Sequence, residues 1–252
     1  MTPPVVLTIA GSDSGGGAGI QADLKTFAAL GAYGVSVVTA ITAQNTLGVT
    51  AIHSVPADIV AAQLDAVLDD FEVAAVKVGM VGDPAVAAVI AERAPRLPNL
   101  VVDPVLVATS GSRLSGVAAV EPLVAYPRVL TPNRHEAGAL LEARVETAEE
   151  MARAAAALAS RGPEAVVVTG SELAVDVLHT SGRTETLRGE PVPTANNHGS
   201  GCTFSSAIAA RLALGDDVAA AVRNAKSYVA RALAGGRDWK LGAGPGPLHH
   251  FA

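Results

Sequence analysis

The chain has 252 residues, a formal net charge of -6 and a single cysteine, Cys202. An acidic balance without a basic cluster argues against binding to nucleic acid or to an anionic membrane surface. One cysteine excludes an internal disulfide framework and is typical of a reducing compartment. We therefore expect a soluble, cytoplasmic protein with no nucleic-acid or membrane partner.

Half of the residues are hydrophobic but only 3% are aromatic, so Ala, Val, Leu and Ile must build the core. The apolar runs end in charges, glycine or proline well before the roughly 20 residues that a membrane-spanning helix needs. The amino-terminal sequence has no basic stretch ahead of an apolar one and does not resemble a signal peptide. We expect one domain over residues 1–252 and no membrane span.

Short β-branched segments alternate along the chain with longer segments of helical periodicity. This alternation predicts an α/β fold with a mostly parallel central sheet and helices on both faces. Strands are expected at residues 5–9, 35–41, 74–78, 100–103, 128–131, 165–169 and 174–179, and a further polar strand after Arg183 would complete an antiparallel edge hairpin. Helices are expected at residues 19–30, 57–70, 84–93, 134–141, 148–160, 203–214 and 217–233. Thr147 and Glu150 predict a capping box at the start of the fifth of these helices.

The segment from Asn197 to Ala207 contains small residues that lead directly into an Ala-rich helix. Gly199, Ser200 and Gly201 can direct backbone N–H groups toward one point, where the helix N-terminus adds about half a positive charge. Such a cradle suits the negative charge that spreads over phosphoryl oxygens during transfer. The alternative is an ordinary glycine-rich turn before a capped helix.

Cys202 falls in the first turn of that helix. The helix N-terminus is expected to lower the pKa of the thiol below its free value of about 8.5, so that a thiolate could accept a proton from an alcohol. A lone cysteine is, however, often an inert buried hydrophobic residue.

The glycine-rich segment 10–23 follows the first expected strand. It lacks the Gly-Lys-Ser/Thr ending of a phosphate loop and the spaced glycines of a dinucleotide fingerprint. A glycine-rich turn at the carboxyl end of a strand can instead bring backbone close to a flat ligand and hinge over it. The alternative is a plain flexible turn.

Polar residues also follow several other strands, at the edge where open α/β sheets bind ligands. Asp103 and Glu136 could hold Mg²⁺ near phosphates, directly or through water, because this ion takes few carboxylates and keeps several waters. Thr169 and Gly170 lie where a nucleotide could contact backbone. Taken singly, each such residue is more often a cap or a solvated turn residue.

Seven ordered motifs, spread from about residue 5 to Leu248, resemble the hydroxymethylpyrimidine kinase/phosphomethylpyrimidine kinase family of thiamine biosynthesis. They are Ala10-Gly11-Ser12-Asp13 with Gly19-Ile20-Gln21-Ala22-Asp23-Leu24-Lys25-Thr26, Thr42-Ala43-Gln44-Asn45-Thr46, Lys77-Val78-Gly79-Met80, Val102-Asp103-Pro104-Val105, Thr131-Pro132-Asn133 with Glu136, and His198-Gly199-Ser200-Gly201-Cys202-Thr203. The resemblance implies a ribokinase-like fold, ATP with Mg²⁺ and a homodimer. It also implies two successive phosphorylations, of 4-amino-5-hydroxymethyl-2-methylpyrimidine and then of its monophosphate.

The resemblance further implies roles for individual residues. Gln44 would bind the aminopyrimidine ring, in a pocket formed with Gly11, Asp23 and Met80. The nucleotide phosphates and magnesium would be served by Asn133, Asp103 and Glu136. The segment 199–202 would form the anion hole, with Cys202 in the place that an aspartate base occupies in many ribokinase-like sugar kinases. Family members more often have threonine where this chain has Ser200, and often a lysine with paired glycines where it has Thr169-Gly170-Ser171.

Three alternatives remain. A pyridoxal/pyridoxine kinase has the same fold and phosphorylates a hydroxymethyl group on a related heterocycle, although Gln44 and Met80 favour the pyrimidine. A sugar kinase is less expected because the anion-hole helix has Cys202 in place of an aspartate. A non-catalytic pyrimidine or nucleotide sensor would keep the pocket without turnover, but Asp103, Glu136 and Cys202 argue against it.

Overall fold

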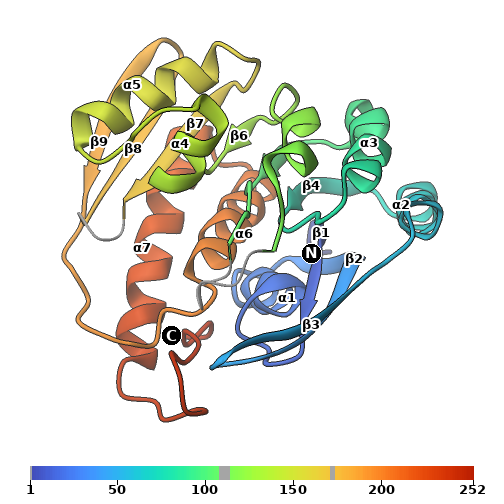
Figure 1. The fold of residues 1–252 in the computed structure, drawn as a ribbon, viewed down its shortest axis with the longest axis horizontal. Helices are drawn as coiled ribbons and strands as arrows, with labels where there is room; N and C mark the ends of the chain where they lie inside the picture. The colour runs from blue at the N-terminus through green and yellow to red at the C-terminus, as the bar shows by residue number, and fades with distance from the viewer. Residues whose placement is uncertain (1, 108–113, 171–173) are drawn as a thin grey trace.

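A nine-stranded sheet forms the centre of the protein, as seen in a computed structural model that describes residues 2–107, 114–170 and 174–252 (Figure 1). The strand order is β3-β2-β1-β4-β5-β6-β7-β8-β9. The strands are β1 (Val5–Asp13), β2 (Tyr33–Asn45), β3 (Gly48–Ser54), β4 (Val73–Val78), β5 (Leu100–Val102), β6 (Val129–Leu130), β7 (Ala165–Gly170), β8 (Val175–Thr180) and β9 (Arg183–Arg188). From β2 through β7 neighbouring strands are parallel, whereas β3, β8 and β9 pair antiparallel to their neighbours. The predicted α/β architecture with an antiparallel edge hairpin is confirmed.

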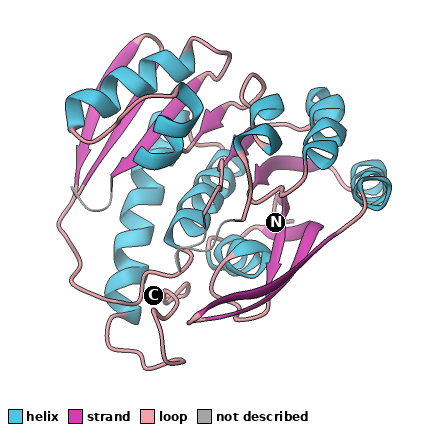
Figure 2. Ribbon diagram, in the orientation of Figure 1, coloured by secondary structure: helices cyan, strands magenta, loops and turns pink. Residues whose placement is uncertain are grey.

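Helices cover both faces of this sheet (Figures 1 and 2). The α-helices are α1 (Gly19–Ala29), α2 (Ala57–Asp70), α3 (Pro84–Arg93), α4 (Arg134–Leu141), α5 (Ala148–Ala159), α6 (Ser200–Ala213) and α7 (Val218–Gly236), and short 3-10 helices lie at Ala94–Arg96, Val117–Ala119 and Glu121–Leu123. One hydrophobic cluster joins the sheet to α2, α3, α4 and α5, and a second joins it to α1, α6 and α7. None of the described helices is both long and apolar enough to cross a membrane.

Two capping boxes fix helix starts next to the expected site. The predicted box at α5 is confirmed, since Thr147 accepts from the N–H of Glu150 and Glu150 accepts from the N–H of Thr147. Asn133 and Glu136 form a second box at α4. Helix α6 begins at Ser200, three residues before its predicted start, because Gly199 has a left-handed backbone (φ 85°) that closes the preceding turn.

The β2–β3 pair is the largest departure from the predicted elements. Strand β2 was expected to end at Ile41 but continues to Asn45, so Gln44 lies within the strand and pairs with Val49. Strand β3 was not predicted, because it is an edge strand with mostly exposed residues and no alternation of buried and exposed positions.

Candidate active site

A buried ion pair underlies the carboxyl edge of the sheet. Lys77, near the end of β4, lies 2.9 Å from both carboxylate oxygens of Asp23 on α1, and both side chains are fully buried. Thr8 donates to Asp23 Oδ2 at 2.6 Å, and Ser206 of α6 donates to Oδ1 at 2.7 Å. Asp23 was predicted to help form the substrate pocket, and in the structure its carboxylate is fully buried in this ion pair.

Gly79 makes room for the Lys77 amine. A Cβ atom at this position would lie 2.6 Å from Lys77 Nζ, so a side chain here would displace the ammonium group. Burial opposes the charge of Lys77, but attraction to Asp23 outweighs it and holds the pKa of Lys77 above its ordinary value. The site therefore contains a buried ammonium group whose charge is balanced by Asp23.

The predicted anion hole lies at the N-terminus of α6, directly against the glycine-rich segment. A Cβ on Gly199 would overlap the carbonyl group of Gly17, so this close approach of two loops requires glycine. A Cβ on Gly201 would lie 3.9 Å from Asp103 Oδ2. The structure thus brings the segment 199–202 and Asp103 together, as the sequence predicts for residues that serve one phosphoryl group.

The predicted pKa of Cys202 is wrong in direction. Burial raises the pKa of its thiol to about 12, although the residue keeps part of its surface exposed. The charge of Lys77 acts in the opposite direction, but the nearby carboxylates of Asp23 and Asp103 raise the pKa further. The sequence argument considered only the helix N-terminus and could not foresee burial beside two carboxylates. Cys202 is therefore a neutral thiol at neutral pH in this environment.

Asp103 and Glu136 form a pair of buried carboxylates that influence each other. Asp103 follows β5 and accepts from Ser205 Oγ at 3.1 Å. Glu136 accepts from the N–H of Asn133 at 2.8 Å and, more weakly, from that of Leu106 at 3.4 Å. Burial raises the pKa of both groups above their ordinary values, and the charge of Asp103 raises that of Glu136 further. Two buried carboxylates with raised pKa values form an environment that would favour an incoming cation.

The residues expected at the nucleotide lie together at the ends of β6 and β7. Asn133 and Thr169 form an isolated parallel bridge, and Thr169 N–H donates to the carbonyl of Pro132 at 2.9 Å. The side chain of Asn133 caps α4 by accepting from two backbone N–H groups. A Cβ on Gly170 would lie 2.7 Å from the carbonyl oxygen of Val175, so glycine is required where the end of β7 approaches the start of β8. Ser171, which belongs to the same predicted motif, lies outside the described residues.

The remaining residues of the predicted substrate pocket lie on β1 (Gly11), on β2 (Gln44) and just after β4 (Met80). A Cβ on Gly11 would lie 3.1 Å from Met80 Sδ, which shows that these two residues are neighbours. Met80 is almost fully buried, and its carbonyl oxygen accepts from Thr39 Oγ1 at 2.7 Å. Gln44 is half-buried and is tied to the glycine-rich segment, because its backbone exchanges two hydrogen bonds with the hydroxyl of Ser14.

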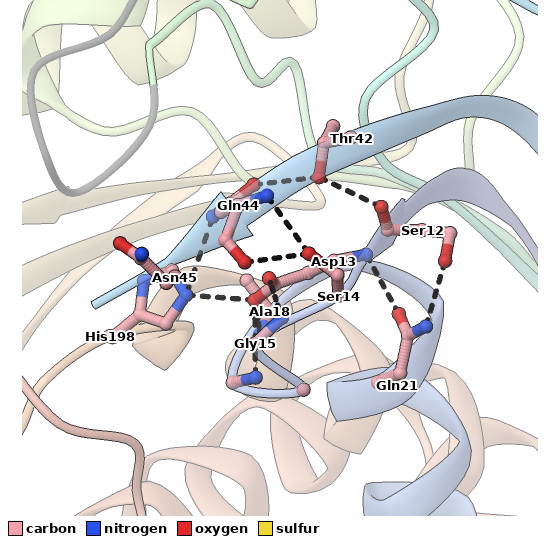
Figure 3. A network of polar contacts seen from close by, with 12 residues as sticks. Ser12, Asp13, Ser14, Gly15, Ala18, Gln21, Thr42, Gln44, Asn45 and His198 are labelled. Carbon is pink, nitrogen blue, oxygen red and sulfur yellow. Dashed lines mark hydrogen bonds and ion pairs between the residues drawn. The ribbon is translucent and has the colours of Figure 1, made fainter. Parts of the chain in front are cut away.

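A polar network that was not predicted joins the glycine-rich segment to the anion-hole loop (Figure 3). Asp13 accepts from His198 Nε2 at 2.9 Å and from three backbone N–H groups of the segment 15–18. Burial alone would raise the pKa of Asp13, but the hydrogen bonds from His198 and from the backbone lower it below its usual value. Asp13 and His198 were quoted as parts of motifs, yet only the fold brings positions 185 residues apart into contact.

The C-terminal segment closes over the same loops. Thr46 Oγ1, in the β2–β3 turn, accepts from the N–H groups of Ala243 and Gly244. Asn196, just before the anion-hole loop, accepts from the N–H of Gly246 at 2.9 Å and donates to the carbonyl of Trp239 at 2.8 Å. Three segments that are distant in sequence thus meet at one end of the molecule (Figure 1).

Known proteins match both the sequence and the fold of this chain. The family model described as phosphomethylpyrimidine kinase matches residues 13–249. A hydroxymethylpyrimidine/phosphomethylpyrimidine kinase from Rhizobium meliloti is 50% identical, and the match covers 98% of this chain and 97% of the relative. The pyridoxal kinase of Bacillus subtilis, solved as an ADP complex, has a TM-score of 0.89 at 35% identity, covering 99% of this chain and 98% of that one. A phosphomethylpyrimidine kinase from Clostridium difficile has a TM-score of 0.81 at 41% identity, covering 91% of this chain and 99% of that one. The chain therefore belongs to the phosphomethylpyrimidine kinase family.

Proposed function

We propose that this protein uses ATP to phosphorylate the hydroxymethyl group of 4-amino-5-hydroxymethyl-2-methylpyrimidine and then converts the monophosphate to the diphosphate. Family membership supports this substrate and its place in thiamine biosynthesis. The single structural observation behind it is the convergence of Gly201, Cys202 and Asp103 above a buried Lys77. This convergence supports the proposal, because backbone N–H donors and the Lys77 ammonium group would stabilise the negative charge that a phosphoryl group gains during transfer.

The chemistry follows from positioning more than from base catalysis. In an in-line transfer with a loose transition state, the alcohol loses its proton late, and stabilisation of the equatorial oxygens contributes most. The N–H groups of Gly201 and Cys202 stabilise these oxygens at the start of α6, whereas the N–H of Ser200 donates to the carbonyl of Asn197. A Cys202 thiol with a raised pKa fits this scheme, because it can stay close to the alcohol without having to be ionised beforehand.

Asp103 and Glu136 fit a Mg²⁺ ion bound with the nucleotide. Among the residues that the structure describes, no group of three or more His, Cys, Asp and Glu side chains could hold a metal alone. Mg²⁺ usually takes one or two carboxylates and completes its shell with waters and phosphate oxygens, so this pair is sufficient. The ion would neutralise charge on the transferred phosphates. Asn133, Thr169 and Gly170 then provide the neighbouring nucleotide surface.

Gln44, with Gly11 and Met80, would bind the pyrimidine ring. The carboxamide offers one donor and one acceptor, which matches an amino group beside a ring nitrogen. Gln44→Ala should therefore weaken pyrimidine binding by roughly 1 to 3 kcal/mol, because a buried ring partner is left unpaired. Calorimetric titration measures this loss, and wild-type affinity in the variant would exclude the role.

The decisive experiment is ATP turnover with Mg²⁺ on the pyrimidine alcohol, its monophosphate and pyridoxal at matched concentrations, with products identified by mass. We expect mono- and then diphosphate from the pyrimidine, with a much higher kcat/KM than for pyridoxal. Pyridoxal is the second candidate because this fold is so similar to that of a pyridoxal kinase. A preference for pyridoxal would overturn the assignment of Gln44, and absence of turnover would favour a sensor.

Replacing Cys202 tests its part in the reaction. Cys202→Ser keeps a small hydroxyl at the helix N-terminus but removes the thiol, and we expect kcat to fall about tenfold or more with pyrimidine binding largely unchanged. Steady-state kinetics and titration calorimetry separate the two effects. Unchanged turnover would remove the thiol from the mechanism.

A homodimer is also part of the proposal. Ile41 of β2, which pairs with His53, and Ile52 of β3, which pairs with Thr42, are 55% and 42% exposed, and both line a hollow of about 450 Å³. Sedimentation velocity would detect the dimer. Ile41→Lys with Ile52→Lys should shift it to monomer, whereas a wild-type monomer would exclude it.

A further inference from the structure

Asp13 can only accept hydrogen bonds in its present setting. Its Oδ1 faces the N–H of Gly15 at 2.7 Å, and its Oδ2 faces the N–H groups of Gly17 and Ala18 at 3.1 and 2.9 Å. The fourth partner is His198 Nε2 at 2.9 Å from Oδ2. Because three backbone donors already occupy a buried carboxylate, the group is ionised and has no proton to offer.

His198 must therefore donate from Nε2. An ionised carboxylate accepts only, so the hydrogen of this contact belongs to the imidazole. The ring is held in place, since His198 is nearly buried, its backbone N–H donates to Gly246, and a Cβ on Gly17 would overlap its ring. Nε2 thus presents an N–H to its surroundings and cannot accept a hydrogen bond.

The carboxamide of Gln44 lies between the side chains of His198 and Thr42 (Figure 3). Gln44 Nε2 lies 3.4 Å from His198 Nε2, which places one donor against another. At the other end, Gln44 Oε1 lies 3.1 Å from Thr42 Oγ1. The single hydrogen of that hydroxyl has a shorter acceptor, the carbonyl of Ser12 at 2.9 Å, so lone pairs of Thr42 remain for Gln44.

A half-turn of the carboxamide removes the donor–donor contact. Gln44 Oε1 then takes the place 3.4 Å from His198 Nε2, whose single N–H donates to Asp13 at 2.9 Å and has this oxygen as a weaker second acceptor, and Gln44 Nε2 donates to the hydroxyl of Thr42. The two neighbours favour the same orientation independently of each other. We propose that His198 and Thr42 are positioning residues that lock the Gln44 carboxamide in this orientation, and thereby set the preference for an aminopyrimidine alcohol over a pyridoxal-type alcohol.

The proposal rests on the proposed function, in which Gln44 binds the ring. When their hydroxymethyl groups are superposed, the pyrimidine presents an amino donor and then a ring-nitrogen acceptor along one edge. Pyridoxal presents an aldehyde oxygen, an acceptor, and then a hydroxyl donor at the same places. A carboxamide held in one orientation can pair with only one of these two donor–acceptor orders and places like groups against the other. A carboxamide that turns freely can pair with either ligand.

Matched variants test the two contacts. His198→Leu removes the donor, and His198→Gln keeps one N–H for Asp13 and one for Gln44. Thr42→Val removes the hydroxyl, and Thr42→Ser keeps it. We expect His198→Leu and Thr42→Val to lower the ratio of kcat/KM for the pyrimidine alcohol to that for pyridoxal about tenfold, mainly through KM of the pyrimidine, with KM for ATP unchanged. The conservative variants should keep most of the discrimination. An unchanged ratio in Thr42→Val, with a wild-type Tm, overturns the proposal even if His198→Leu fails to fold.

A measurement without turnover distinguishes this proposal from the proposed function. In isotope-labelled wild-type protein without substrate, we expect nuclear Overhauser effects from the Gln44 side-chain amide protons to the methyl group of Thr42. Effects to the ring protons of His198 would overturn the proposed orientation, even if the pyrimidine is phosphorylated. Conversely, the expected contacts together with no pyrimidine turnover would retain the lock and reject the proposed function.

Discussion

Two groups of buried charge lie within the same site, and they differ in how they are compensated. Asp23 has a cation at 2.9 Å and two hydroxyl donors, so its charge is balanced within the fold. Within the described part of the chain, Asp103 and Glu136 accept hydrogen bonds but form no ion pair, and burial raises the pKa of both, although the charge of Lys77 acts to lower that of Asp103. The first group is complete as folded. The second consists of carboxyl groups whose ionised forms are disfavoured by burial, and a bound cation would favour those forms, which supports the proposed Mg²⁺ position.

The difference indicates that one group of charges stabilises the fold, whereas the other favours ligand binding. Charge that is paired within the chain stabilises the fold, and here its hydrogen bonds hold β4 and α6 against α1. Charge that remains uncompensated costs stability and favours a ligand of opposite sign. Removing a charge from the first group should therefore destabilise the ligand-free protein, whereas removing one from the second group should stabilise it.

The largest expected effect comes from breaking the balanced pair. Lys77→Met leaves the Asp23 carboxylate buried without its cation, and we expect a loss of about 3–5 kcal/mol in the free energy of unfolding. Urea unfolding followed by circular dichroism measures it. The control is Lys77→Met with Asp23→Asn, which removes both charges and should recover most of the loss. If the double variant is no more stable than the single one, Asp23 does not depend on Lys77.

A smaller effect is expected from two adjacent hydroxyl groups on α6. Ser206→Ala removes a donor from the ionised Asp23, which should cost about 1.5–3 kcal/mol. Ser205→Ala removes a donor from Asp103, whose raised pKa allows it to take up a proton instead, and should cost less. The two serines are equally buried, so they form a matched pair for thermal unfolding. Equal losses would show that the two carboxylates do not differ in compensation.

The smallest effect has the opposite sign. Glu136→Gln keeps an oxygen for the capping box of α4 but removes a charge, and should stabilise the ligand-free protein by about 1 kcal/mol, or roughly 2–4 °C in Tm. Because the folded pKa of Glu136 lies above its unfolded value of about 4.3, the wild type loses stability as the pH rises from there toward the folded pKa. The advantage of the variant should grow over that range, at the expense of turnover. A Tm difference that does not change with pH would refute this account.

The sequence predicted the elements well where periodicity and caps coincide. Helix α5 follows its Thr147–Glu150 box, and the buried strands of the sheet lie close to their β-branched runs. Strand β3 was missed because an edge strand with exposed residues lacks the alternation on which strand prediction depends. The site was predicted as a set of strand ends, which requires only that parallel strands finish at one edge.

Contacts between distant segments could not be predicted in the same way. Nothing near Cys202 in the chain indicates that Asp23 and Asp103 raise its pKa. The pairing of Asp13 with His198 depends on the close approach of Gly17 and Gly199, which is visible only once both loops are placed. Local sequence thus locates the groups, whereas their protonation and partners follow from tertiary packing.

The C-terminal segment that contacts the anion-hole loop and the β2–β3 turn carries a tryptophan whose fluorescence can report on these contacts. Trp239 is the sole tryptophan of the chain, and the centroid of its indole lies 4.7 Å from that of the His249 ring. Its carbonyl accepts a hydrogen bond from Asn196, which precedes the anion-hole loop in the sequence. The same segment is tied to the β2–β3 turn through Thr46. The protein therefore contains an intrinsic fluorophore whose emission depends on the packing of these three segments, so stopped-flow fluorescence without a label would report any change in that packing when a ligand binds.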